Sequence, residues 1–113
     1  MEVRAIHRDA KVSPRKVRLV LELIRGKPAT EALTLLEFLP QPSARVVWKT
    51  VKSAMANAEN NFDLNPDALV IKRADASDAR TLRRFKARSR GRAAPRLKRY
   101  SHIEIVVDDE GVF

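Results

Sequence analysis

A chain of 113 residues, 44% of them hydrophobic, is long enough to bury one core and indicates a single domain. The chain contains no cysteine, which excludes disulfide scaffolds, thiolate metal sites and thiol nucleophiles. Its apolar runs are only a few residues long, so we expect neither a membrane span nor a secretory signal. The net charge of +9 points instead to an anionic partner.

The first half of the chain shows the 3.6-residue periodicity of amphipathic helices. Ser13 followed by Pro14 predicts the start of a first helix, and Gly26 predicts its end. A second, short helix is expected after Pro28, and a third, the longest, from about Pro42. The positions expected to face the core are Val17, Val20, Leu21 and Ile24, then Ala32, Leu35, Leu36 and Leu39, then Ala44, Val47, Trp48, Val51, Ala54, Met55 and Ala58.

Strand periodicity replaces helical periodicity in the second half of the chain. A cluster of turn-forming residues over 60–67 is expected to close the helical half. Side chains then alternate with a period of two over 69–72 and again over 102–107, which predicts two strands. A weaker alternation over 3–8 indicates a third strand.

The excess of positive charge lies in one segment, residues 80–99, which holds ten basic residues and no acidic one. Outside it, 13 basic residues face 14 acids. The segment has few apolar side chains to bury and repels itself, which predicts an external polyanion. Most of its cations are arginines, which bind phosphate oxygens in pairs and stack on bases, so nucleic acid is favoured. The ten residues are Arg80, Arg83, Arg84, Lys86, Arg88, Arg90, Arg92, Arg96, Lys98 and Arg99.

The basic segment connects two predicted strands, and so long a structureless connection inside a compact domain is uncommon unless it is functional. A turn signal at 89–91 indicates that the two strands continue past the sheet as a hairpin. We expect this hairpin over about 77–100, and a globular body made of 1–76 and 101–113. Arms of about 14 residues at about 3.3 Å each reach on the order of 45 Å, well beyond the body.

Binding by this arm should consist mainly of phosphate and sugar contacts, because only Phe85 and Tyr100 offer rings for stacking. The basic residues of the first helix, Arg15, Lys16 and Arg18, form a second candidate patch on the body. Recognition of shape and charge is therefore favoured over recognition of base sequence.

No constellation of catalytic residues is found in the sequence. The two histidines, His7 and His102, both fall on predicted strands, where a surface or packing role is expected. With no metal-ligand cluster and no glycine-rich phosphate loop, we predict no enzyme activity, no cofactor and no metal site. Two other classes stay open from the residues alone. One is a DNA architectural protein that uses a basic β-arm, and the other is a polybasic protein of the membrane surface.

Three separated blocks carry a family resemblance. They are SPRKVRL at 13–19 with IRGK at 24–27, SAMANAENN at 53–61, and RSRGR at 88–92 with KRYSHI at 98–103. In this order and spacing they resemble bacterial-type ribosomal protein L22, over nearly the whole chain. The resemblance implies an α+β fold, in which three helices pack on a small antiparallel three-stranded sheet with a long protruding basic β-hairpin.

The resemblance also implies a function and a location. The body would sit on 23S ribosomal RNA and support subunit assembly, and the hairpin would line the peptide exit tunnel near protein L4. The free protein would be a monomer without membrane contact. Its place would be the cytoplasmic ribosome, with an organellar ribosome left open.

The residues that match the family at its RNA contacts fall in two groups. On the first helix they are Ser13, Arg15, Lys16 and Arg18. On the hairpin they are Arg83, Arg84, Arg88, Arg90, Arg92, Lys98 and Arg99, with Arg88, Ser89, Arg90 and Gly91 at the tip, next to the macrolide-binding region in the family.

The chain departs from the family pattern at two places in the hairpin. Ala79 and Arg80 stand where the family commonly has Gly-Pro, and Ala87 stands where a proline usually precedes the tip arginine. Proline fixes φ and blocks edge pairing, so both departures alter the expected stiffness of the arm. The acidic ending over 108–110 is a third, milder difference.

Overall fold

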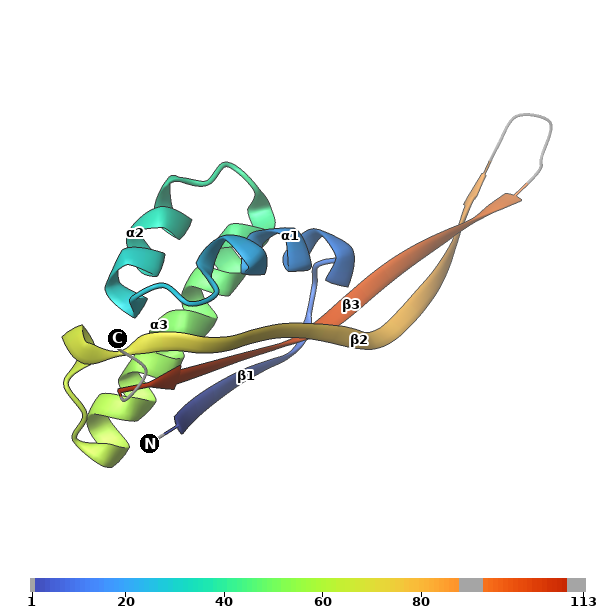
Figure 1. The fold of residues 1–113 in the computed structure, drawn as a ribbon. Coiled ribbons are helices and arrows are strands. Elements are labelled where there is room, and N and C mark those ends of the chain that lie inside the picture. Colours follow the sequence, from blue (N-terminus) through green and yellow to red (C-terminus); the bar gives the residue numbers. More distant parts are fainter. Residues whose placement is uncertain (1, 88–92, 110–113) are drawn as a thin grey trace.

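The computed structural model describes the backbone of residues 2–87 and 93–109, and the side chains of residues 2–79 and 99–109. The described part forms an elongated molecule with principal extents of 61 × 25 × 19 Å, in which a helical body gives way to a long two-stranded arm (Figure 1). The elements in chain order are β1 (Glu2–Ala10), α1 (Pro14–Ile24), α2 (Ala29–Phe38), α3 (Pro42–Phe62), a 3₁₀ turn (Pro66–Ala68), β2 (Val70–Ala87) and β3 (Ala93–Asp108).

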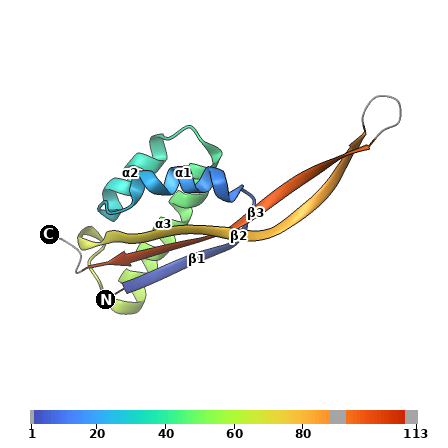
Figure 2. The ribbon, with the colours of Figure 1, turned by 45° about the vertical axis from the view of Figure 1, so that its right-hand side comes forward.

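The three strands form one antiparallel sheet in the order β1-β3-β2, so β3 is central. Ile105 of β3 lies opposite Ala5 of β1 on one side and Ala74 of β2 on the other. The helices all lie on one face of this sheet, and its other face is open to solvent (Figures 1 and 2). The α+β architecture that the sequence analysis expected, including the third strand at the N-terminus, is therefore confirmed.

The core lies between the helices and the covered face of the sheet. The apolar face predicted for α1 is turned toward this core, with Leu21 and Ile24 fully buried. Ile103 and Ile105 of β3 belong to the same core and contribute to it from the side of the sheet. Full burial of one such side chain favours folding by about 1.5–3 kcal/mol relative to leaving it exposed. The described residues of the body thus form a continuous core of their own.

Helix α3 is longer than the sequence analysis expected. The predicted turn cluster began at 60, but the helix continues to Phe62 and ends where Asp63 adopts a left-handed conformation with φ 54°. Asparagines are weak helix formers, yet the buried Ala58 holds the last turn against the core. The backbone N–H of Leu64 donates to the Ala58 carbonyl at 3.1 Å, which closes the helix end.

The strands β2 and β3 stay paired far beyond the helices. Their pairing runs from Val70 opposite Asp108 in the body to Ala87 opposite Ala93 in the arm, with register shifts between Ile71 and Arg73 and between Asp78 and Thr81. The radius of gyration is 16.9 Å. A compact chain of this length would have a radius of about 13 Å, so the difference reflects the protruding arm. The predicted tip at 88–91 lies outside the described residues.

We predict that Leu21→Ala lowers the free energy of unfolding by about 2–5 kcal/mol, because it removes a buried side chain and leaves a cavity beneath α1. Leu19→Ala in the same helix is the matched control, since Leu19 is 65% exposed. Its effect should stay within about 0.5 kcal/mol. Urea unfolding followed by circular dichroism measures both. Equal losses in the two variants would contradict the assignment of the buried face of α1.

Candidate nucleic-acid interface

The hairpin backbone places the predicted cations along two facing arms. Arg80, Arg83, Arg84 and Lys86 belong to β2, and Arg96, Lys98 and Arg99 belong to β3. The register puts Arg84 directly opposite Arg96. Like charges opposite each other destabilise a strand pair, so an anion that neutralises them would stabilise the pairing of β2 with β3. Arg88, Arg90 and Arg92 lie outside the described residues, as do Ser89 and Gly91.

The predicted helix patch lies at the N-terminal end of α1, beside the root of the hairpin (Figure 1). Arg15 and Lys16 are exposed in the first turn of the helix. Ser13 holds the N-cap position in extended backbone, as predicted, but its side chain makes no capping hydrogen bond. The loop before the helix is fixed to the sheet, because the buried Ser101 of β3 donates its hydroxyl to the carbonyl of Val12 at 3.0 Å.

Two arginines, Arg18 of α1 and Arg25 directly after it, bind the backbone of the edge strand β2. Arg25 donates from Nε and Nη2 to the carbonyl of Ala74, at 3.0 and 2.7 Å, and Arg18 donates from Nε to the carbonyl of Ala76 at 3.1 Å. Charged donors make the stronger hydrogen bonds, and here they occupy carbonyls that an edge strand would otherwise offer to another strand. Arg18, predicted only as an RNA contact, therefore also holds the body together.

The open face of the sheet neutralises its own charges. Glu104 on the central strand pairs with Arg4 of β1 at 3.9 Å and with Arg73 of β2 at 3.5 Å. Near the start of β2, Lys72 pairs with Glu2 and also with Asp108, the latter at 3.6 Å. This face consequently offers little net charge to a polyanion.

Among the described residues, the contact between Glu2 and Lys72 clearly shifts the pKa values of both groups. The hydrogen bond and charge of Lys72 hold the pKa of Glu2 below its ordinary value, and Glu2 raises the pKa of Lys72. The lowered Glu2 pKa gives stability that is lost as the pH falls, and the raised Lys72 pKa gives stability that is lost as the pH rises. Both side chains are exposed, so the pair adds little to folding.

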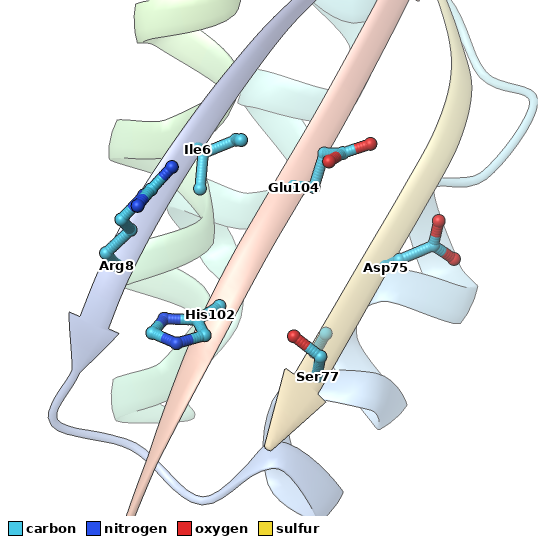
Figure 3. Close-up of a pocket in the computed structure, with 7 residues that line it drawn as sticks. Ile6, Arg8, Asp75, Ser77, His102 and Glu104 are labelled. Atoms are coloured by element: carbon cyan, nitrogen blue, oxygen red, sulfur yellow. The ribbon is translucent and has the colours of Figure 1, made fainter. Parts of the chain in front are cut away.

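Figure 3 shows a shallow hollow on the same open face, lined by Ile6, Arg8, Asp75, Ser77, His102 and Glu104. Its histidine is engaged structurally, because Nδ1 of His102 accepts the backbone N–H of Asp9 at 3.1 Å. That contact supports the irregular end of β1, where Asp9 has a positive φ of 53°. Among the described residues, no group of three His, Cys, Asp or Glu side chains is placed to hold a metal ion.

Uncompensated cations gather at the N-terminal end of α1 instead. The ion pairs between described residues involve Arg4, Arg25, Lys27, Lys72 and Arg73. None of these pairs includes Lys11, Arg15 or Lys16, which are all exposed. Lys11 was missed by the sequence analysis, because it precedes the helix and belongs to no periodic face. The described part of the molecule also has no helix that is long and apolar enough to cross a membrane.

Comparison with known proteins gives a consistent family. The family model for ribosomal protein L22p/L17e matches residues 5–108. The chain is 53% identical over 109 residues to large ribosomal subunit protein uL22 of Dehalococcoides mccartyi strain CBDB1, covering 96% of this chain and 100% of the relative. It is 51% identical over 109 residues to large ribosomal subunit protein uL22 of Staphylococcus aureus strain NCTC 8325 / PS 47, covering 96% of this chain and 93% of that protein.

We predict that Arg25→Ala lowers the free energy of unfolding by about 1–3 kcal/mol, because it leaves the buried carbonyl of Ala74 without its charged donor. Arg15→Ala is the matched control, since it removes an exposed arginine at the other end of α1. That change should shift the free energy of unfolding by less than about 0.5 kcal/mol. Urea unfolding measures both variants. An unchanged midpoint in Arg25→Ala would show that the two hydrogen bonds to Ala74 do not contribute to stability.

Proposed function

This chain belongs to the ribosomal protein L22 family, and from that premise we propose that its hairpin and its α1 patch bind 23S ribosomal RNA through phosphate and shape contacts. As a member of the family it is a structural, non-enzymatic protein of the large ribosomal subunit, with ribosomal RNA and ribosomal proteins as partners. The finer assignment to 23S RNA, and the residues that carry it, are the proposal.

One observation carries the proposal, namely the separation of a self-sufficient body from an arm that holds the charge excess. The body buries its own core and pairs the charges on its open sheet face. The arm has ten cations over 80–99 and no acidic residue within that segment. Ribosomal RNA supplies closely spaced phosphates on all sides of such an arm, so binding there removes the repulsion along the ladder.

The proposed RNA contacts on the hairpin are Arg80, Arg83, Arg84, Lys86, Arg88, Arg90, Arg92, Arg96, Lys98 and Arg99, and those on the body are Ser13, Arg15, Lys16 and Arg18. The shape of the molecule supports a hairpin that reaches inward from a surface-bound body. We propose that this hairpin, about 77–100, lines the peptide exit tunnel near protein L4, with residues 88–91 at its tip. The body of 1–76 and 101–113 would stabilise the assembled subunit.

The proposed location is the cytoplasmic ribosome, with a monomer as the free form and no contact with a membrane. An organellar ribosome would impose the same chemistry. From the residues alone, a DNA architectural protein with a basic β-arm was an alternative. Membership of the L22 family favours RNA instead, so structured ribosomal RNA should compete with duplex DNA at matched salt.

We predict that reversing three charges near the tip, Arg88→Glu, Arg90→Glu and Arg92→Glu, weakens binding to 23S RNA at least tenfold. The slope of log affinity against log salt should lose about 2–3 units, since each phosphate contact contributes about 0.7–0.9. Filter binding at several salt concentrations measures both quantities. The urea midpoint should not change, because the body has a core of its own.

The matched control reverses three charges on the outer side of α3, namely Arg45→Glu, Lys49→Glu and Lys52→Glu. This triple variant has the same net charge and should retain most of its RNA affinity. Equal losses in the two triple variants would show that net charge alone drives binding. Unfolding of the hairpin variant would show that the arm packs against its own domain.

A further inference from the structure

A groove of about 480 Å³ separates the start of α1 from the start of α3. It lies on the helical side of the molecule, away from the open face of the sheet. Its polar lining comes from two stretches that are distant in sequence, and consists of Lys11, Ser13, Lys16, Gln41 and Ser43. Ser13 and Lys16 were predicted as RNA contacts, whereas Lys11, Gln41 and Ser43 were not.

Two helix N-termini converge on this groove. Ser13 is the N-cap of the 11-residue α1, and Gln41 is the N-cap of the 21-residue α3. Neither N-cap side chain makes a capping hydrogen bond, so the N–H groups of both first turns lack the usual side-chain acceptor. Helix N-termini carry partial positive charge, and together they favour an anion between them.

Ser43 supplies an independent observation. The residue is only 5% exposed, and its hydroxyl has no hydrogen-bond partner among the described residues. In that part of the chain every fully enclosed polar side-chain atom has a partner. The Ser43 hydroxyl must therefore reach open space, which the groove provides. In the groove this hydroxyl is a donor that no other described residue uses, so it is available to an acceptor that enters there.

The charges around the groove match an anion as well. Lys11 and Lys16 are both exposed, and neither joins an ion pair between described residues. The wall that carries Lys11 is held in place by the hydrogen bond from Ser101 to Val12. The groove is thus built on rigid elements and has two free ammonium groups at its rim.

We propose that this groove binds one backbone phosphate of the RNA, with the Ser43 hydroxyl and the first-turn N–H groups as donors and with Lys11 and Lys16 as counter-charges. The inference rests on the proposed function and adds a defined contact to it. A phosphodiester fits better than a carboxylate, because donors reach the groove from several directions and a phosphate offers more acceptor oxygens. The groove also lies next to the hairpin root, so one RNA strand can contact both.

The first experiment uses the full chain labelled with ¹⁵N and titrated with inorganic phosphate, at constant ionic strength set with chloride. The backbone amides of Lys16 and Ser43 should shift together and saturate. The same titration of Ser43→Ala should give clearly weaker binding, whereas Ser53→Ala, an exposed serine of the same helix, should behave like the wild type. Shifts that grow linearly without saturation in the wild type would overturn the inference.

The second experiment measures binding of 23S RNA over a range of salt. Ser43→Ala should lower the affinity roughly tenfold, since a hydrogen bond to a charged group is lost. Lys11→Gln should reduce the salt slope by about 0.7–0.9, the contribution of one phosphate contact. Ser53→Ala and Lys49→Gln are the matched controls for these changes, and both should bind like the wild type.

Stability separates a ligand donor from a structural hydroxyl. Without phosphate or RNA, Ser43→Ala should be at least as stable in urea as the wild type, because no internal hydrogen bond is lost. A clear loss of stability would show that the hydroxyl already has an internal partner, and would overturn the inference. If the wild type binds RNA while Ser43→Ala and Lys11→Gln match their controls, the groove is not used but the proposed function stands. If the wild type itself fails to bind RNA, both fall.

Discussion

The continuous pairing of β2 with β3 is the constraint on which the rest of the structure depends, because one ladder serves both the body and the arm. In the body, β3 is paired on both sides, and the burial of Ile103 and Ile105 fixes its register. A slip by one residue would turn these side chains to solvent. The pairing of the two strands continues to Ala87 and Ala93 through two register shifts, between Ile71 and Arg73 and between Asp78 and Thr81, so the arm extends the same two strands that the core of the body holds in place.

The charges are also distributed unevenly over the molecule. On the open face of the sheet, acidic residues such as Glu104 pair with neighbouring bases, which removes most of the net charge there. At the start of α1, the exposed Lys11, Arg15 and Lys16 join no ion pair with another described residue. Along the hairpin, the segment 80–99 holds ten basic residues and no acidic one. The arginines in and next to α1 also differ in role. Arg25, which follows the helix, donates twice to a strand carbonyl and pairs with Asp75, while Arg15 is exposed and joins no ion pair with another described residue.

Most of the fold could be predicted from sequence, because it follows from local signals. Pro14 and Gly26 bound α1, and the apolar period between them identifies its buried face. No local sequence pattern predicts the contacts between distant segments. The bond from Arg25 to the carbonyl of Ala74 depends on how α1 lies across β2, and the groove combines Lys11 with Ser43 from another helix. Helix α3 continues past its predicted end because packing against the core outweighs the weak helix propensity of its last residues.

The arm links folding to binding through its own repulsion. Its backbone ladder can form without a partner, yet the register sets Arg84 opposite Arg96, and each such pair costs free energy while it stays unneutralised. Phosphates that surround the arm lower this cost only in the bound state. The two effects are linked. RNA binding therefore stabilises the paired arm by the same free energy by which pairing of the arm strengthens RNA binding. The body is already stable through its own core, so it can hold the root of the hairpin and the start of α1 in one fixed relation. Part of the conformational entropy that binding would otherwise cost is thus already lost when the free protein folds.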